Sequence, residues 1–196
     1  IMKSLYENSE YKKHLARRGN KQIVMLGFSD GTKDGGYFMA NWSIYRAKKI
    51  LTKISDKFGL KIAFFDGRGG PPARGGGNTH EFYASMGNKI QADDIQLTIQ
   101  GQTISSNFGT NDSCQYNLEQ LLSSGIHNQV FNSERNVLSD EDRETMNKLA
   151  LKSHSAYQNF KAHPEFLPYL EQMTTLKYYS NANIGSRPSK RGSSKK

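Results

Sequence analysis

Two charged residues three positions apart, Asp30 and Lys33, lie in the polar, glycine-rich segment GFSDGTKDGG (27–36). A carboxylate can bind a divalent cation, and a lysine can bind phosphate or stabilise a developing negative charge. The segment nearly matches a P-loop, but that motif needs a glycine directly before the lysine, and Thr32 stands there. A P-loop nucleoside triphosphatase is therefore disfavoured. An ion-binding segment and a polar turn with solvated charges remain as alternatives.

A second candidate is the loop GRGGPPARGGG (67–77). Its glycines, Gly69 and Gly70 among them, allow backbone N–H groups to approach an anion closely. Arg68 and Arg74 add planar guanidinium groups that suit carboxylate or phosphate oxygens. Because so much glycine makes a loop costly to order, we predict an anion-binding loop that is mobile and becomes fixed on binding.

An RNA-binding module is the main alternative, because GRGG and ARGGG are typical of arginine–glycine RNA-binding segments. It would also use the basic segment RPSKRGSSKK (187–196), in which Arg187 precedes a proline. Without these ten residues the chain has 22 Lys and Arg against 18 Asp and Glu, so half of its +9 charge is terminal. A nucleic-acid footprint should instead lie on a folded face, which weakens this alternative.

The elements that must position these residues form a strand–helix–strand unit. Residues 23–28 and 60–65 are apolar runs with the length of buried strands, and residues 36–58 show helical periodicity. This order predicts two parallel strands joined by a right-handed crossover. The segments 29–36 and 66–79 both follow a strand, so we place them as loops at the carboxyl edge of the sheet, where α/β proteins bind ligands.

The other predicted elements are mostly helical. We expect helices over about 1–20, 79–85, 112–124, 139–160 and 164–176, a strand over 95–100, and a β-like stretch over 103–108. Ser139 and Asp142 form a capping-box variant at the start of the predicted helix 139–160. The inner face of that helix is predicted to consist of Met146, Leu149, Ser153, Tyr157 and Phe160.

Composition favours a folded, cytoplasmic protein. Apolar runs reach only about six residues, far short of the roughly 20 needed to span a membrane. The single cysteine, Cys114, excludes an internal disulfide, and the five histidines show no metal-ligand spacing. The chain opens at Ile1 rather than methionine and ends within a basic run, so we expect a fragment of a longer protein.

Four motifs in this order resemble phosphoenolpyruvate carboxylase: VMLGFSDGTKDGG (24–36), FFDGRGGPPARGGGNTH (64–80), LTIQGQTI (97–104) and IGSRPSKR (184–191). The resemblance implies an α/β fold, part of a parallel β/α (TIM-like) barrel with many additional helices. Residues 1–196 would then be an incomplete fragment of the catalytic barrel domain, with a catalytic loop at 66–79 and a basic segment at 187–196.

The resemblance also implies an activity. The family converts phosphoenolpyruvate and bicarbonate into oxaloacetate and phosphate with Mg²⁺ or Mn²⁺, and so supplies the tricarboxylic acid cycle. It is a cytoplasmic homo-oligomer, a tetramer in the family, with no nucleic-acid or membrane partner. Matched motif by motif, the metal ligand is Asp30, the catalytic residues are Lys33, Arg68 and Arg74, and the substrate-binding residues are Arg187, Gly69 and Gly70.

The chain departs from the family pattern at several positions. The family usually has histidine before GRGG, and Asp66 stands there. An ionised Asp66 would repel an anion unless it turns outward or binds a cation. Ala73 replaces a glycine, Pro71 and Pro72 stiffen the loop, and Gln102 replaces a glutamate. We expect a divergent but active enzyme, of which this chain alone has negligible activity.

Overall fold

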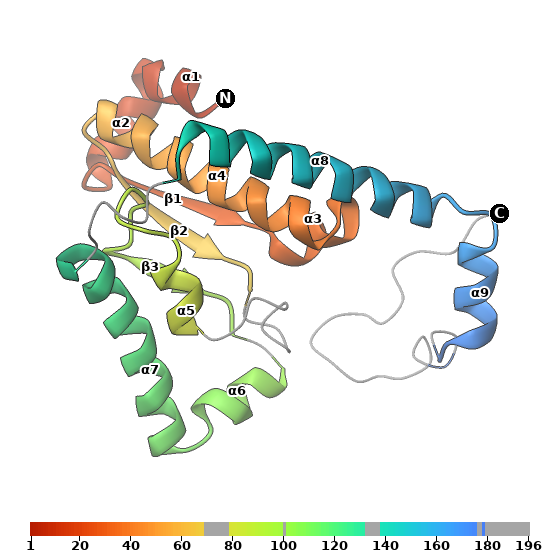
Figure 1. Ribbon diagram of the computed structural model, residues 1–196. Coiled ribbons are helices and arrows are strands. Elements are labelled where there is room, and N and C mark those ends of the chain that lie inside the picture. The colour runs from red at the N-terminus through yellow and green to blue at the C-terminus, as the bar shows by residue number, and fades with distance from the viewer. Residues whose placement is uncertain (69–78, 100, 132–137, 176–177, 179–196) are drawn as a thin grey trace.

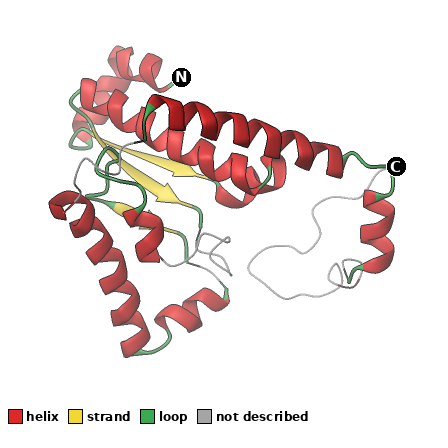
Figure 2. Cartoon of the chain, in the orientation of Figure 1, coloured by secondary structure: helices red, strands yellow, loops and turns green. Residues whose placement is uncertain are grey.

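The computed structural model describes residues 1–68, 79–99, 101–131, 138–175 and 178. Helices surround a small parallel sheet (Figures 1 and 2). The α/β class predicted from the sequence is confirmed. Within the described residues the sheet is an open row of three strands, so a closed barrel is not seen.

The sheet has the order β1-β2-β3, from β1 (Lys21–Leu26), β2 (Lys61–Asp66) and β3 (Ile95–Leu97). Both strand pairs are parallel, which confirms the predicted crossover. The first strand ends two residues earlier than predicted, and the third stops at Leu97 rather than at residue 100.

The crossover helix α4 (Tyr37–Lys57) matches its prediction closely. It ends before Gly59, whose φ of 65° is the left-handed conformation that glycine tolerates best. Its inner stripe includes Ile44 and Thr52, which are buried beside the sheet. The core under it contains Ile62 and Phe64 of β2.

The segment 29–36 is not a loop, as we predicted, but part of helix α3 (Phe28–Gly35). Its glycines disfavour a helix locally, and contacts made later in the chain compensate. Helix α8 (Asp140–Lys161) binds the last carbonyls of α3: Tyr157 Oη and Lys161 Nζ each donate to Lys33 O at 3.0 Å. His154 Nδ1 lies 3.2 Å from Gly35 O, and Gln158 Nε2 donates to Asp34 O, so four side chains of α8 cap this helix end.

Helices α4 and α8 lie side by side and run in opposite directions (Figure 1). Trp42 Nε1 and Arg46 of α4 both donate to Asn147 Oδ1 of α8, at 2.8 and 3.1 Å. The capping box of Ser139 and Asp142 is confirmed.

The predicted inner face of α8 is correct in part. Tyr157 packs against Gly36, and Met146 and Ser153 are half-buried. Leu149 and Phe160 are instead exposed, at 50% and 62%. The buried position is Ala150, because the contact with α4 follows a stripe displaced from the one that we inferred from apolar residues alone.

Two of the remaining elements differ from their predictions. The predicted helix over 1–20 is divided at Asn8, which caps the second of two helices, and the β-like stretch 103–108 is helical. Its start follows Gly101 at φ 61°, where the extended chain turns. These elements are α1 (Met2–Glu7), α2 (Ser9–Arg17), α5 (Thr79–Ala84), α6 (Gln102–Phe108), α7 (Asn111–Ile126), the π-helix η2 (His127–Phe131) and α9 (Phe166–Met173). None of the helices in the described part of the chain has the length and apolarity to cross a membrane.

The junction between α3 and α4 generates a stability prediction. Gly36 has φ 80° and ψ 161°, a region open almost only to glycine, and an added Cβ would lie 3.1 Å from Tyr157 Cγ. We expect Gly36→Ala to lower the free energy of unfolding by about 1–3 kcal/mol, measured by urea denaturation followed by circular dichroism.

Gly125→Ala is the matched control. Gly125 lies inside α7, and apart from its chain neighbours and the backbone of its own helix, no atom of the described residues lies within 4 Å of an added Cβ. This change should leave stability equal or raise it by up to about 1 kcal/mol. Equal urea midpoints for Gly36→Ala and wild type would contradict the close packing of Gly36 against Tyr157.

Candidate functional site

The two candidate segments leave the sheet side by side. Leu26 and Asp66, the last residues of β1 and β2, are register partners. Gly67 N donates to Leu26 O at 3.0 Å, and a Cβ at Gly67 would lie only 3.0 Å from that same oxygen. The close approach requires glycine at position 67. It brings the start of α3 next to the start of the arginine–glycine loop at the carboxyl edge of the sheet.

Asp30 and Lys33 lie on α3 with their charged groups in solvent. Their side chains are 77% and 71% exposed, and Lys33 Nζ lies 3.8 Å from Asp30 Oδ1. An exposed pair at this distance contributes little to stability, so both groups can exchange partners when a ligand arrives. The carbonyl of Lys33 is held by α8, so the backbone under these side chains is fixed.

Arg68 is buried rather than presented to solvent, with 4% of its surface exposed. Its guanidinium carbon lies 3.8 Å from the ring centre of Phe82, a stacked cation–π contact. Burial lowers the pKa of Arg68, and the neighbouring Tyr83 and Asp66 act in the opposite direction. Phe82 also meets Phe28 of α3 edge-on, at 5.8 Å between ring centres. One aromatic ring therefore links Arg68 to the first residue of α3.

A cavity of about 210 Å³ opens beside Arg68. It is lined by β3 and the residues after it, by α6 and by α7. Thr98, Thr103 and Asn107 place polar side chains around it, while Leu118 and Leu121 form an apolar wall. A guanidinium at the edge of a small, partly apolar cavity is a suitable environment for an anionic group, because few water molecules compete for the charge.

The structure shows how a carboxylate is tolerated at position 66, beside a proposed anion site. The residue is fully buried, and Lys48 Nζ of α4 donates to its Oδ2 at 2.6 Å. Tyr83 Oη of α5 donates to the same oxygen at 2.8 Å. Asp66 therefore binds a cation, which was one of the two ways in which a carboxylate could be tolerated here.

The surroundings of this pair show how strongly the site is desolvated. Burial lowers the pKa of Lys48, although Asp66 opposes that shift. Burial and the carboxylate of Asp66 both raise the pKa of Tyr83, so its hydroxyl remains protonated and donating. Removing one partner of such a buried pair typically costs about 3–5 kcal/mol, because the other charge is left without compensation.

Lys48, Phe82 and Tyr83 were not singled out from the sequence. Lys48 had a recognisable signal: it lies four residues after Ile44 and four before Thr52, on the buried stripe of α4. A lysine there requires a buried acceptor, and Asp66 ends the adjacent strand. The two aromatic residues of α5 carried no comparable signal, because a Phe-Tyr pair after a loop is most simply a packing feature.

Several predicted site residues lie outside the described residues. These are the loop residues Gly69, Gly70 and Arg74 and the basic-segment residue Arg187. The predicted mobility of the loop also concerns residues 69–78, which lie outside the described part of the chain. Of the predicted site residues, the structure thus places Asp30, Lys33 and Arg68, and it brings their segments to one edge of the sheet.

The metal site cannot be built from clustered ligands in the described part of the chain. No group of three or more His, Cys, Asp or Glu residues converges there. Asp30 is a single exposed carboxylate in the first turn of α3. Mg²⁺ is often held by one or two carboxylates, with water and substrate oxygens completing its coordination, so Asp30 fits as one such ligand.

Comparison with known protein families finds a match over the whole chain. The family model described as "Phosphoenolpyruvate carboxylase" matches residues 1–196 of the chain. The match covers the strand ends, α3, the arginine–glycine loop and the basic segment together. The chain therefore belongs to the phosphoenolpyruvate carboxylase family.

Proposed function

We propose that this chain forms part of the active site of a phosphoenolpyruvate carboxylase, which makes oxaloacetate and phosphate from phosphoenolpyruvate and bicarbonate. Membership of the family supports the reaction class, a carboxy-lyase that fixes carbon dioxide. The observation that carries the proposal is the register of Leu26 with Asp66, which starts α3 and the arginine–glycine loop side by side. Cations from both segments can thereby act on one substrate.

The residues have complementary tasks in this proposal. Lys33 provides an exposed ammonium that binds the phosphate of phosphoenolpyruvate and stabilises charge as the phosphoryl group leaves. Arg68 provides a guanidinium whose orientation is restricted by stacking on Phe82. It stabilises the negative charge of the substrate carboxylate or of the enolate. Arg74 as catalytic residue, and Arg187, Gly69 and Gly70 as substrate-binding residues, rest on the motif resemblance.

Asp30 would hold Mg²⁺ or Mn²⁺ together with groups beyond the described residues. When bound, the cation would neutralise charge on the substrate oxygens. We further propose that the chain is part of a longer cytoplasmic enzyme with a β/α barrel, active as a homo-oligomer. These points rest on the family rather than on the geometry of the chain.

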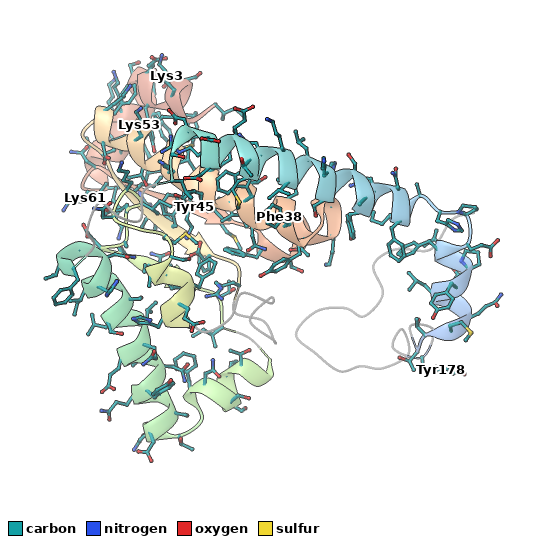
Figure 3. All side chains as sticks on the ribbon, viewed as in Figure 1. Lys3, Phe38, Tyr45, Lys53, Lys61 and Tyr178 are labelled. Carbon is teal, nitrogen blue, oxygen red and sulfur yellow. The ribbon has the colours of Figure 1, made fainter. Side chains whose placement is uncertain are left out.

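The RNA-binding alternative finds no support in the site. Arg68, one of the two loop arginines on which it depends, is buried against Phe82 instead of being presented to solvent. Lys53 and Lys61 lie at the end of the sheet and of α4 opposite to α3 (Figure 3). These basic side chains therefore do not extend the candidate site.

The proposed roles predict distinct kinetic losses in the full-length protein that contains this chain. Lys33→Ala should reduce kcat by about 10²–10³-fold, because a group that stabilises transition-state charge is removed. Arg68→Lys keeps the charge but loses the planar stacking contact, and should reduce kcat/KM by at least about tenfold. Oxaloacetate is measured by coupling to malate dehydrogenase.

Lys53→Ala serves as the control, since it removes an exposed lysine at the opposite end of α4. Its kinetic constants should equal those of the wild type. If Lys33→Ala keeps wild-type kcat, the role of Lys33 is wrong. If the wild-type protein releases no phosphate in response to bicarbonate, the proposed reaction is wrong.

A separate prediction concerns the isolated chain of 196 residues. Its described part offers one metal-binding carboxylate and one buried arginine at the candidate site, so it should form no measurable oxaloacetate. The same coupled assay, at matched molar concentrations of the chain and of the full-length protein, checks this. Turnover by the chain alone would overturn the prediction.

A further inference from the structure

The last turn of α3 is bound by a polar stripe on α8. Four half-buried side chains at helical spacing form this stripe: His154, Tyr157, Gln158 and Lys161. A helix face that packs inside a protein is usually apolar, yet Phe160, the apolar side chain of the same turn, is 62% exposed. Helix α8 therefore meets the end of α3 through hydrogen-bonding groups (Figure 1).

The polar stripe binds the carbonyl groups at the end of α3 one after another. Tyr157 Oη and Lys161 Nζ both donate to Lys33 O, at 3.0 Å. Gln158 Nε2 donates to the next carbonyl along the chain, and His154 Nδ1 lies 3.2 Å from the one after it. Carbonyl groups in the last turn of a helix have no partner within that helix, so these contacts supply what α3 lacks. The ammonium of Lys161 also suits the negative end of the helix dipole.

The two halves of α3 are held by different parts of the protein. The first turn contains Phe28, which is buried, and Asp30. It packs closely on α4, since a Cβ added at Gly31 would lie 3.5 Å from Ala40 Cβ. The last turn contains Lys33 and is bound by the polar stripe of α8. A change in the stripe should therefore affect Lys33 more than Asp30.

Lys33 connects the polar stripe to the candidate site. Its carbonyl accepts two hydrogen bonds from α8, while its ammonium is in solvent, 3.8 Å from Asp30 Oδ1. Residues three apart share one face of a helix, and they do so only while the turn between them stays helical. A misplacement of about 1 Å can slow a reaction by up to about 10²-fold, so the conformation of this turn matters to any reaction that uses Lys33.

We propose that Tyr157 and Lys161 are positioning residues for Lys33. They bind its carbonyl, keep the last turn of α3 helical and so direct its ammonium toward the phosphate of phosphoenolpyruvate. Both act through the backbone of Lys33 rather than by contact with the substrate. The inference rests on the proposed function for the task of Lys33, whereas the dependence of α3 on α8 rests on the hydrogen bonds themselves.

The test is a double-mutant cycle in the full-length protein that contains this chain. Tyr157→Phe/Lys161→Met removes both donors to Lys33 O but keeps the aromatic ring and most of the aliphatic chain. We expect kcat/KM for phosphoenolpyruvate to fall about tenfold. In a Lys33→Ala background the same two substitutions should change kcat/KM by less than about twofold, because the group that they position is absent.

Lys152→Met/Tyr169→Phe is the matched control. It removes the same groups from two exposed side chains, one on α8 and one on α9. Its kcat/KM should equal that of the wild type. A merely structural role for the polar stripe, or a simple loss of positive charge, would lower kcat/KM by the same factor with and without Lys33. That result, or an unchanged kcat/KM in the presence of Lys33, would overturn the proposal.

Amide hydrogen exchange gives a readout that needs no substrate. Peptides covering residues 28–36 should exchange faster in Tyr157→Phe/Lys161→Met than in the wild type and in the control variant, because the last turn of α3 opens more often. Equal exchange in all three proteins would contradict the dependence of α3 on α8. If the paired substitution prevents folding, Lys161→Met alone decides by the same cycle, and a change in kcat/KM of less than about twofold then overturns the proposal.

The Kd for phosphoenolpyruvate separates this inference from the proposed function. It is measured by isothermal titration without bicarbonate, in the same cycle of variants. If the wild type binds phosphoenolpyruvate without turnover, and the Kd values show the expected dependence on Lys33, only the proposed function fails. If the wild type turns over and the effects of the two sets of substitutions simply multiply, only this inference fails.

Discussion

The buried ion pair of Lys48 and Asp66 is the constraint on which the arrangement of the site depends. Two opposite charges withdrawn from water must meet within hydrogen-bonding distance, and here Nζ and Oδ2 are 2.6 Å apart. The pair therefore fixes the rotation of α4 about its axis relative to the end of β2. Tyr83 donates to the same carboxylate oxygen, so α5 is fixed as well. The arginine–glycine loop begins at this junction, directly after Asp66. The position of its first arginine, Arg68, is therefore restricted as well.

Helix α3 shows a second dependence, on residues far away in sequence. Two of the eight residues of Phe28–Gly35 are glycine and Gly36 follows directly, a composition that favours a loop. Side chains of α8, more than 100 residues later, bind the carbonyls of Lys33 and Gly35. A helix end without partners would be costly in a partly buried position. The placement of Asp30 and Lys33 is thus a tertiary effect rather than a local one.

The sequence predicted the elements that carry strong local signals. Three local features were predicted correctly: the periodic apolar residues of α4, the glycine after its end and the capping box of α8. Each of them depends on only a few neighbouring residues. Helices α3 and α6 were missed because their glycine and β-branched residues disfavour helix locally and their packing overrides that preference. Within the site, the sequence predicted which segments meet at the edge of the sheet, but not which side chains contact one another. Lys48 was overlooked because most helical lysines are solvated, and only the burial of its stripe distinguishes it.

The charges of the site differ in how strongly each can act. Asp30 and Lys33 stand in water, where a pair at 3.8 Å interacts weakly and is screened by salt. Arg68 is buried among aromatic rings, where a charge of the same size has a much stronger effect on a neighbouring anion. The buried pair of Lys48 and Asp66 stabilises the junction between α4 and the end of β2, and next to it Arg68 lies against Phe82 and lines the cavity. The buried charges thus hold the elements together, while the exposed charges of α3 remain accessible to solvent.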